Sequence, residues 1–325
     1  MIALLAVLQA SLTIALGGSP TSLEHLPIRV AEAQGDFARE GLAVTILSAR
    51  TELDAAAALA QGQAELAAIS LEAALRFGTT DGKPPRLVFG LTAAPPVALL
   101  VPAAYEESVR ELTDLSGKRV GVASPGAPEQ TLLMALLERA GLEFTRITLL
   151  SLGARGLVAA LERGEVHAGL VGDPWTHYLV KEGKAKILMD FRLRREAKRW
   201  LGGATVHTGL FTRANDSLPA ARLARVARAL LRAIRRLETV PPGELLARLP
   251  PRVLGTQEEE RKIRLESARE LYLPGGQVRP EAIRRSLAVI RARAPLPHAV
   301  LIPRSLTDLL LMDPLDKARE LPAER

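Results

Sequence analysis

The first two thirds of this chain alternate short apolar runs with segments of helical spacing, and this alternation constrains the fold most strongly. Residues 12–16 (LTIAL) form an apolar run that ends at small and turn-forming residues, as a buried strand followed by a turn would. Residues 22–40 then carry apolar side chains at helical spacing. Strands that alternate with helices form βαβ units around a mostly parallel sheet. The pattern therefore predicts an α/β fold.

The alternation starts a second time near residue 97, so we expect two α/β lobes, formed near residues 11–96 and 97–207. Beyond about residue 213 only helical patterns remain. Strands are expected at residues 12–16, 44–47, 65–70, 86–92, 97–101, 119–123, 147–151, 167–171, 185–190 and 208–213. Helices are expected at residues 22–40, 53–60, 71–77, 129–140, 154–163, 175–181, 220–237, 258–272, 280–293 and 305–311.

Composition and motifs exclude several kinds of chemistry. The chain has no cysteine, which excludes disulfides, thiolate metal sites, a cysteine nucleophile and a lipid-anchoring cysteine. No apolar run reaches the roughly 18 residues of a membrane span. The sequence lacks phosphate-loop, dinucleotide-turn, nucleophile-elbow and zinc-helix motifs. Its five histidines are scattered without the spacing of metal ligands. We expect no catalytic residue, no metal and no cofactor.

The net charge of +7 is concentrated in the last third of the chain. Residues 1–209 carry a net charge of −1, and residues 210–325 carry +8. The helical pattern of residues 220–237 places four arginines on or beside the face opposite its apolar side chains. Such a face can bind nucleic acid or an anionic membrane, but here it lacks interleaved aromatics and a recognised binding fold. We expect a solvated helix face and no nucleic-acid partner; the arginines are Arg222, Arg225, Arg232 and Arg236.

Small polar turns follow the predicted strands of both lobes. In open α/β sheets, ligands bind just beyond the carboxyl ends of the strands. Small residues let a ligand approach the backbone, and free N–H groups at helix starts can bind an anionic group. Each turn alone could be an ordinary loop, but their joint placement favours a ligand site. The turns contain Gly17-Gly18-Ser19, Ser70, Thr92-Ala93-Ala94, Ser124–Pro128 and Gly172-Asp173.

Asp173 and Trp175 allow two interpretations each. Asp173 precedes a proline and fits a helix N-cap, with Pro174 at the first helical position. Its carboxylate could equally face a ligand and accept hydrogen bonds from an amine or amide. Trp175 could form a flat apolar wall of the site or pack in the core. Trp200, in a charged stretch, is expected to be a packing or rim residue.

Residues 1–10 (MIALLAVLQA) are apolar and end in a small residue. A secretory signal has a basic segment before its apolar run and small residues at the cleavage site. Here the basic segment is missing, and Leu8 occupies a position that favours a small residue. We interpret residues 1–10 as the remnant of an export signal; the alternative is an apolar lead-in to the first strand.

Several segments, taken in order, resemble the substrate-binding proteins of ABC transporters. The resemblance is to the group that serves sulfonates, taurine, nitrate and pyrimidine precursors of thiamine. Each segment alone is weakly specific, whereas their order and spacing over most of the chain are more specific. The segments are LTIALGGSP at 12–20, AEAQGDFAREGLAVTI at 31–46, LTDLSGKRVGVASPGAPEQTLL at 112–133, VAALERGEVHAGLVGDPWTHYLVKEGKAKIL at 158–188, GGQVRPEAIRRSLAVI at 275–290 and LTDLLLMDPLDKA at 306–318.

The resemblance implies a type II periplasmic-binding-protein fold, in which two lobes joined by two crossing strands close on a ligand. The crossings are expected near residues 97–101 and 207–211. Residues 11–96 with 208–325 would form lobe 1 with the C-terminal helices, and residues 97–207 lobe 2. No arginine stands in the cleft turns, which argues against a sulfonate or nitrate ligand. The expected ligand-binding residues are Gly18, Ser19, Ser70, Thr92, Ala93, Ser124, Gly126, Ala127, Asp173 and Trp175.

The resemblance also implies a function, a location and partners. The protein would be a periplasmic, monomeric receptor of an ABC importer that delivers a small organic or anionic molecule to a membrane permease with a separate ATPase. It would not be an enzyme. One alternative is an enzyme on the same scaffold that acts on a small metabolite in pyrimidine or thiamine-type cofactor biosynthesis; the absent cysteines argue against the related pyrimidine synthases. Another is the effector-sensing domain of a transcription regulator.

Overall fold

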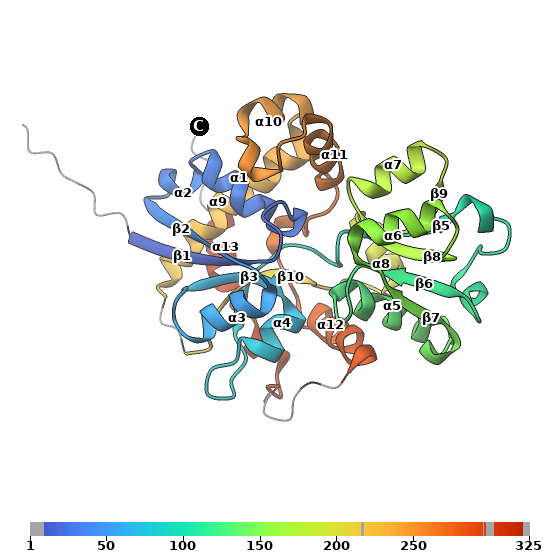
Figure 1. Ribbon diagram of the computed structural model, residues 1–325. Coiled ribbons are helices and arrows are strands. Elements are labelled where there is room, and N and C mark those ends of the chain that lie inside the picture. The colour runs from blue at the N-terminus through green and yellow to red at the C-terminus, as the bar shows by residue number, and fades with distance from the viewer. Residues whose placement is uncertain (1–9, 216–217, 295, 297–301, 321–325) are drawn as a thin grey trace, which may run out of the picture.

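The computed structural model of the protein describes residues 10–215, 218–294, 296 and 302–320, and its elements carry the labels of Figure 1. Residues 1–9, most of the interpreted signal remnant, lie outside the described residues. Within the described part, no helix is both long and apolar enough to cross a membrane.

The first sheet has the strand order β2-β1-β3-β10-β4. Strand β1 pairs in parallel with β2 and β3, and β10 runs antiparallel between β3 and β4. All five residues of β3 are buried, because helices cover both faces of the sheet. The strands are β1 Ala10–Gly17, β2 Leu42–Ala49, β3 Leu66–Ser70, β4 Arg86–Gly90 and β10 Thr208–Thr212.

The second sheet has the same plan, with the order β7-β6-β8-β5-β9. Strand β6 pairs in parallel with β7 and β8, and β5 is antiparallel to β8 and β9. One strand of each sheet thus runs against the other four, which confirms the predicted pair of mostly parallel sheets. The strands are β5 Val97–Pro102, β6 Arg119–Val122, β7 Thr148–Ser151, β8 Ala168–Gly172 and β9 Ala185–Asp190. We call the units built on the two sheets lobe 1 and lobe 2.

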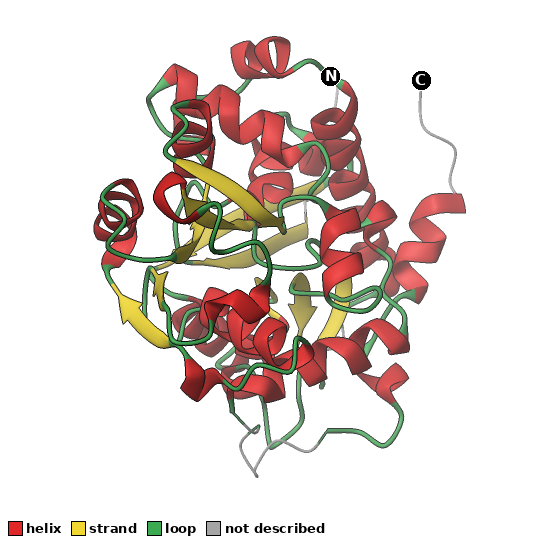
Figure 2. Cartoon of the chain, turned by 90° about the vertical axis from the view of Figure 1, so that its right-hand side faces the viewer, coloured by secondary structure: helices red, strands yellow, loops and turns green. Residues whose placement is uncertain are grey.

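Helices flank both sheets, and the C-terminal helices pack mainly on the first (Figures 1 and 2). Helix α9 contacts α1, α2 and α13, whereas α12 lies between the lobes and contacts α5. The helices are α1 Leu26–Ala33, α2 Asp36–Arg39, α3 Glu52–Ala60, α4 Leu71–Phe77, α5 Pro128–Arg139, α6 Gly153–Glu162, α7 Trp175–Lys181, α8 Arg194–Trp200, α9 Ala220–Thr239, α10 Pro242–Arg248, α11 Glu258–Ala268, α12 Pro280–Arg293 and α13 Asp313–Glu320.

The single helix predicted over residues 22–40 is wrong, because the chain turns sharply inside it. Gly35 has a φ of 70°, the left-handed conformation that glycine adopts without steric cost, and it separates α1 from α2. A short 3₁₀ turn, Leu23–His25, precedes α1. The helix predicted at 305–311 is likewise only a 3₁₀ turn, Leu306–Leu309, and the one predicted at 258–272 ends at Ala268.

Each of the two crossing segments was predicted to lie in a strand. In the structure, each crossing segment lies just before that strand. Strand β5 lies wholly in the second sheet and β10 wholly in the first, so the chain crosses at residues 91–96 and 203–207. The segments lie side by side. The backbone N–H of His207 donates to the carbonyl of Thr92 at 2.8 Å, and the N–H of Thr92 donates to the carbonyl of Thr208 at 3.1 Å. The division of residues between lobes that was predicted with these crossings stays a prediction.

The arginine face of α9 was predicted to be solvated. This prediction is wrong for two of its four arginines, Arg232 and Arg236, because they pair with acids. Arg236 donates to the buried carboxylate of Asp36, with Nη2 at 2.9 Å from Oδ1. Arg232 pairs with Glu40, as does Arg228 at 2.6 Å. Asp36 belongs to α2 and Glu40 directly follows it, so these ion pairs attach α2 to α9.

Tyr272 connects α11 to the entrance of α1. Its ring is fully buried, and its hydroxyl donates to the carbonyl of Leu23 at 2.8 Å. Replacing Tyr272 by phenylalanine is expected to lower the free energy of unfolding by about 1–2 kcal/mol, because a buried carbonyl loses its partner. Denaturant unfolding measures this difference; a stability equal to that of the wild type would contradict the role of the hydroxyl.

Candidate ligand-binding cleft

A cleft of about 390 Å³ opens between the two lobes. Both lobes and one crossing segment line it. Lobe 1 contributes the turn after β1, the 3₁₀ turn and α11, and lobe 2 contributes the loops before α5 and α7 and the start of α6. The lining residues are Ser19, Thr21, Ser22, Leu23, Glu24, Pro95, Pro96, Val97, Ala123, Pro128, Glu129, Ala154, Leu157, Leu170, Val171, Gly172, Asp173, Pro174, Trp175 and Arg264.

The structure brings together some of the predicted ligand-binding residues. Ser19, Asp173 and Trp175 line the cleft. Gly18 stands directly beside Ser19 with a φ of 89°, and its N–H donates to the carbonyl of Ala49 at 3.2 Å. These residues keep their predicted ligand-binding role, which is taken up under the proposed function.

The other predicted positions lie away from the lining. The Ser70 hydroxyl caps α4 by accepting the Ala73 N–H at 3.1 Å. Thr92 is buried in the crossing segment, and its hydroxyl accepts the N–H of Thr208 at 3.3 Å. Ser124 and Gly126 are exposed, and Ala127 precedes α5 as its N-cap residue. Ala123, Pro128 and Glu129 line the cleft instead at that turn.

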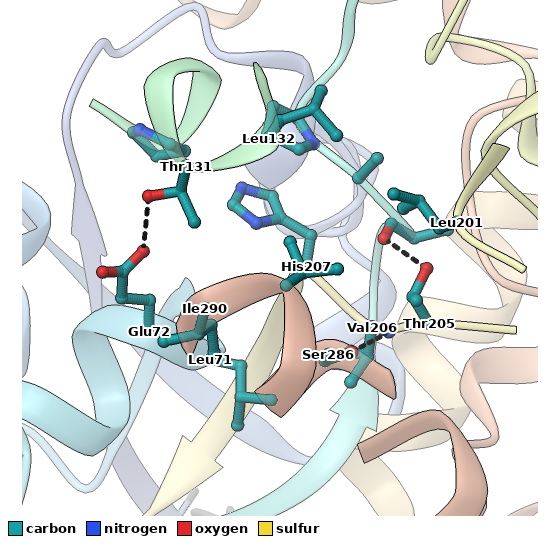
Figure 3. Close-up of a pocket in the computed structure, with 15 residues that line it drawn as sticks. Leu71, Glu72, Thr131, Leu132, Leu201, Thr205, Val206, His207, Ser286 and Ile290 are labelled. Atoms are coloured by element: carbon teal, nitrogen blue, oxygen red, sulfur yellow. Dashed lines mark hydrogen bonds between the residues drawn. The ribbon is translucent and has the colours of Figure 1, made fainter. Parts of the chain in front are cut away.

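Ala93 lines a second, smaller cavity of about 30 Å³ that adjoins the cleft (Figure 3). Pro95 and Pro128 line both spaces. The side chain of His207 points into the smaller cavity, opposite the hydrogen bond of 3.1 Å from Thr131 to Glu72 (Figure 3). A cavity of this size can hold about one or two water molecules.

Asp173 is not the N-cap residue of α7; Pro174 occupies that position. The Asp173 carboxylate is fully buried and accepts two hydrogen bonds from Arg192, at 2.7 and 2.8 Å. It also accepts the His177 N–H at 3.3 Å and the Ser267 hydroxyl. Ser267 belongs to α11, so Asp173 joins the two lobes at one edge of the cleft.

Trp175 begins α7 and keeps 37% of its surface exposed. Its ring meets that of Tyr178 edge to face, with centroids 6.2 Å apart. Because Trp175 lines the cleft and is not packed in the core, the ligand-wall interpretation is the one that its position supports. Trp200 packs on the core of lobe 2, as expected for a packing residue.

Glu24 and His207 form an ion pair where the cleft approaches the crossing segments. The His207 Nε2 lies 2.9 Å from Glu24 Oε1, which also accepts the Thr208 hydroxyl at 2.8 Å. Burial is the largest influence and favours the neutral carboxyl, but the hydrogen bond and charge of His207, with smaller contributions from His25 and Thr208, together lower the pKa of Glu24 to about 2. Burial likewise opposes the charged imidazole, yet Glu24 raises the pKa of His207. Each group therefore stabilises the charged form of the other.

Two further carboxyl groups lie near this pair. Burial raises the pKa of Glu52, and the charge of Glu24 raises it further. Glu52 accepts hydrogen bonds of 2.7 Å from both the N–H and the hydroxyl of Ser70. Burial also raises the pKa of Glu129, which lines the cleft from the first turn of α5. Among the described residues, no group of three or more potential ligands is arranged to hold a metal ion.

Reasoning from the sequence missed Glu24, Glu129, Arg192 and Arg264. Glu129 directly follows the predicted turn and could have been included from its place in the first helical turn. The other residues could not have been identified from the local sequence. Glu24 is 183 positions away from its partner His207, and Arg264 reaches the cleft from a C-terminal helix.

Two α/β lobes joined by two crossing segments, with a cleft between them, define the fold of periplasmic binding proteins. The chain belongs to the NMT1/THI5-like family, whose model matches residues 22–235.

Comparisons with individual proteins agree with this fold. The chain is 29% identical over 101 residues to the putative aliphatic sulfonates-binding protein of Escherichia coli strain K12, and the match spans 31% of each protein. A solved structure from Bordetella bronchiseptica RB50 superposes with a TM-score of 0.71 and 23% identity, over 96% of this chain and 97% of that one. The alkanesulfonate-binding protein SsuA of Xanthomonas axonopodis pv. citri, solved with MOPS bound, gives 0.65 and 20%, over 93% and 98%.

Proposed function

We propose that the protein is the solute receptor of an ABC importer, which binds a small organic molecule between its lobes and delivers it to a membrane permease. The observation that carries this proposal is the cleft of about 390 Å³ with lining residues from both lobes. A pocket of this volume suits a small molecule. The similarity to proteins named for sulfonate binding supports the same class of function.

Binding would work by closure of the two lobes. Contacts from both sides of a cleft stabilise the closed state over the open one, so that a solute shifts the equilibrium towards closure. The structure contains groups suited to this. The Ser267–Asp173 hydrogen bond joins the lobes at one edge, and the 3.1 Å hydrogen bond from Thr131 to Glu72 joins them at the other. The crossing segments between these edges would act as the hinge.

The proposal predicts stabilisation by a solute. A panel of candidate solutes should contain at least one that raises the melting temperature and reduces the radius of gyration measured by small-angle scattering. A broad panel that produces neither change would contradict the receptor function.

Replacing Trp175 by alanine is expected to weaken binding of such a solute about tenfold, because the indole supplies contact area in the cleft. Isothermal titration with the stabilising solute measures the change. Val180→Ala is the matched control, since Val180 is equally exposed on the same helix and does not line the cleft. Equal losses in both variants would argue against contact between Trp175 and the solute.

We also propose that the solute leaves the cleft chemically unchanged. The titratable groups next to the crossing segments are held by protein partners, His207 by Glu24 and Glu52 by Ser70. Mass spectrometry of a stabilising solute after prolonged incubation should recover the compound intact. A product that accumulates with time would favour the enzyme on the same scaffold instead.

The permease, its separate ATPase, the periplasmic location and the monomeric state belong to the same proposal. Reconstitution with a candidate permease would test the partners by solute uptake that depends on this protein. Size-exclusion chromatography with light scattering would test the monomer.

A further inference from the structure

We infer that the cleft receives an organic cation, such as a protonated amine or amidine, and that Glu129 is the residue that selects its charge. The inference rests on the proposed receptor function and concerns the same cleft. Two observations support it: acids of the chain stand at the helix starts around the cleft, and most charged side chains that line the cleft are already paired.

The helix starts around the cleft already carry carboxylates of the chain itself. A helix N-terminus favours an anion, because its free N–H groups and its dipole point towards it. Helix α5, whose first turn lines the cleft, has Glu129 in that turn. Glu24 holds the equivalent place in the 3₁₀ turn and also lines the cleft, whereas Glu72, in the first turn of α4, lines only the adjoining smaller cavity. A sulfonate or nitrate that approached these ends would meet a carboxylate of like charge.

Neither α6 nor α7 has an acid in its first turn; at α7 the preceding Asp173 carboxylate accepts the N–H of His177, which leaves α6 as the exception. Its residue Ala154 lines the cleft, so one helix start remains open there. An anionic solute could use this end, and the experiment below therefore includes an anionic arm.

The cations around the cleft are each balanced by acids. Arg264 pairs with Glu260 at 3.1 Å and donates to the carbonyl of Leu254 at 2.8 Å. Arg192 is shared between Asp173 and Asp190, so that this group of three carries a net negative charge. His207 is balanced by Glu24. Among the described residues, Arg264 is the only arginine or lysine that lines the cleft, so the lining itself offers no unpaired arginine or lysine to an anionic solute; Arg155, in the first turn of α6, is not part of the lining.

Glu129 differs from the other acids of the lining. Within the described part of the chain, no cation lies within ion-pair distance of its carboxylate. Its pKa is raised mainly by burial, against a smaller lowering by the charge of His207, which is already paired with Glu24; the Glu129 carboxylate thus has no ion-pair partner of its own among the described residues. A cation bound beside Glu129 would supply that partner and make a charge-assisted hydrogen bond.

Trp175 adds a surface that suits the same class of solute. Its exposed indole lines the cleft together with Glu129, and the face of an indole attracts a positively charged group. A solute with a cationic group and an apolar or flat body would use both residues.

The test uses thermal denaturation of the full chain with three fractions of a bacterial metabolite extract, separated by ion exchange into cationic, anionic and uncharged compounds. The cationic fraction should raise the melting temperature. In Glu129→Gln, the concentration of that fraction needed for half of the rise should increase about tenfold, because a charged hydrogen bond is lost. Glu138→Gln is the matched control, since Glu138 is an exposed acid at the far end of α5, and it should behave as the wild type does.

The outcomes separate the inference from the proposed function. A rise with the anionic or the uncharged fraction alone would overturn the inference and leave the receptor function standing. An equal response of the wild type and Glu129→Gln to the cationic fraction would remove Glu129 from its selecting role. If no fraction raises the melting temperature, the receptor function fails, and the inference fails with it.

Discussion

Replacing Arg192 by methionine is expected to lower the free energy of unfolding by about 3–5 kcal/mol, because removing one partner of a buried ion pair leaves the other charge uncompensated. The Asp173 side chain is fully buried, and Arg192 is only 14% exposed. Arg192 supplies two of the hydrogen bonds to Asp173 and also pairs with Asp190 at 2.7 Å. Methionine keeps much of the length and none of the charge. Urea denaturation would measure the loss.

Two further variants identify the cause. Arg195→Met removes a neighbouring arginine whose pair with Glu270 is more than half exposed on both sides, and it should change stability by less than about 1 kcal/mol. Adding Asp173→Asn to Arg192→Met removes one of the two carboxylate charges that lose their partner, the more deeply buried one, and should restore part of the loss. If Arg192→Met is as stable as the wild type, or if the double variant is no more stable than Arg192→Met, this explanation is contradicted.

Acid is expected to destabilise the protein in two overlapping ranges of pH, through His25 and then Glu24. Burial lowers the pKa of His25 from 6.5 to about 4, so the folded state binds fewer protons than the unfolded state as the pH falls below 6.5. Stability is then lost from pH 6.5 down to about 4, by about 3 kcal/mol. The pKa of Glu24 is lowered to about 2, and its contribution, present above pH 4.5, is lost as the pH falls towards 2.

Unfolding free energies measured between pH 3 and 8 would test this dependence. His25→Asn should flatten the profile between pH 6.5 and 4 and keep the fall at lower pH. His207 acts in the opposite direction, because its raised pKa adds stability that is present below pH 6.5 and lost as the pH rises through the folded value. Glu52 and Glu129, whose pKa values are raised, add stability as the pH falls towards 4.5, so the comparison of variants decides. A His25→Asn profile with the same slope as the wild type between pH 6.5 and 4 would show that His25 is not responsible.

Much of the fold could be predicted because the local signals agreed with one another. Helix α4 and helix α12 have the bounds that their apolar spacing and flanking residues predict, and α12 begins at a proline, which suits the first position of a helix. Helix α8 was missed because its sequence RREAKRW has no apolar stripe; only Ala197 is buried. The break at Gly35 was missed because apolar spacing continues across it.

The candidate site was predicted less completely, because a turn after a strand does not reveal where its side chains point. Ser70 follows a strand as Ser19 does, yet its hydroxyl turns back to Ala73 and Glu52. Ser19 instead faces the cleft. The charge of the cleft depends on pairs between distant positions, such as Arg192 with Asp173 and His207 with Glu24. Such pairs form only once both sheets are assembled, so no local pattern reports them.

The hydrogen bonds between the two crossing segments have a mechanical consequence. Because His207 and Thr208 are bonded to Thr92, neither connection can bend while the other stays still. The lobes should therefore swing about one axis near these three residues, with little twist or sideways slip. Loops at the rim of the cleft could then change in sequence to suit a different solute while this swing stayed the same.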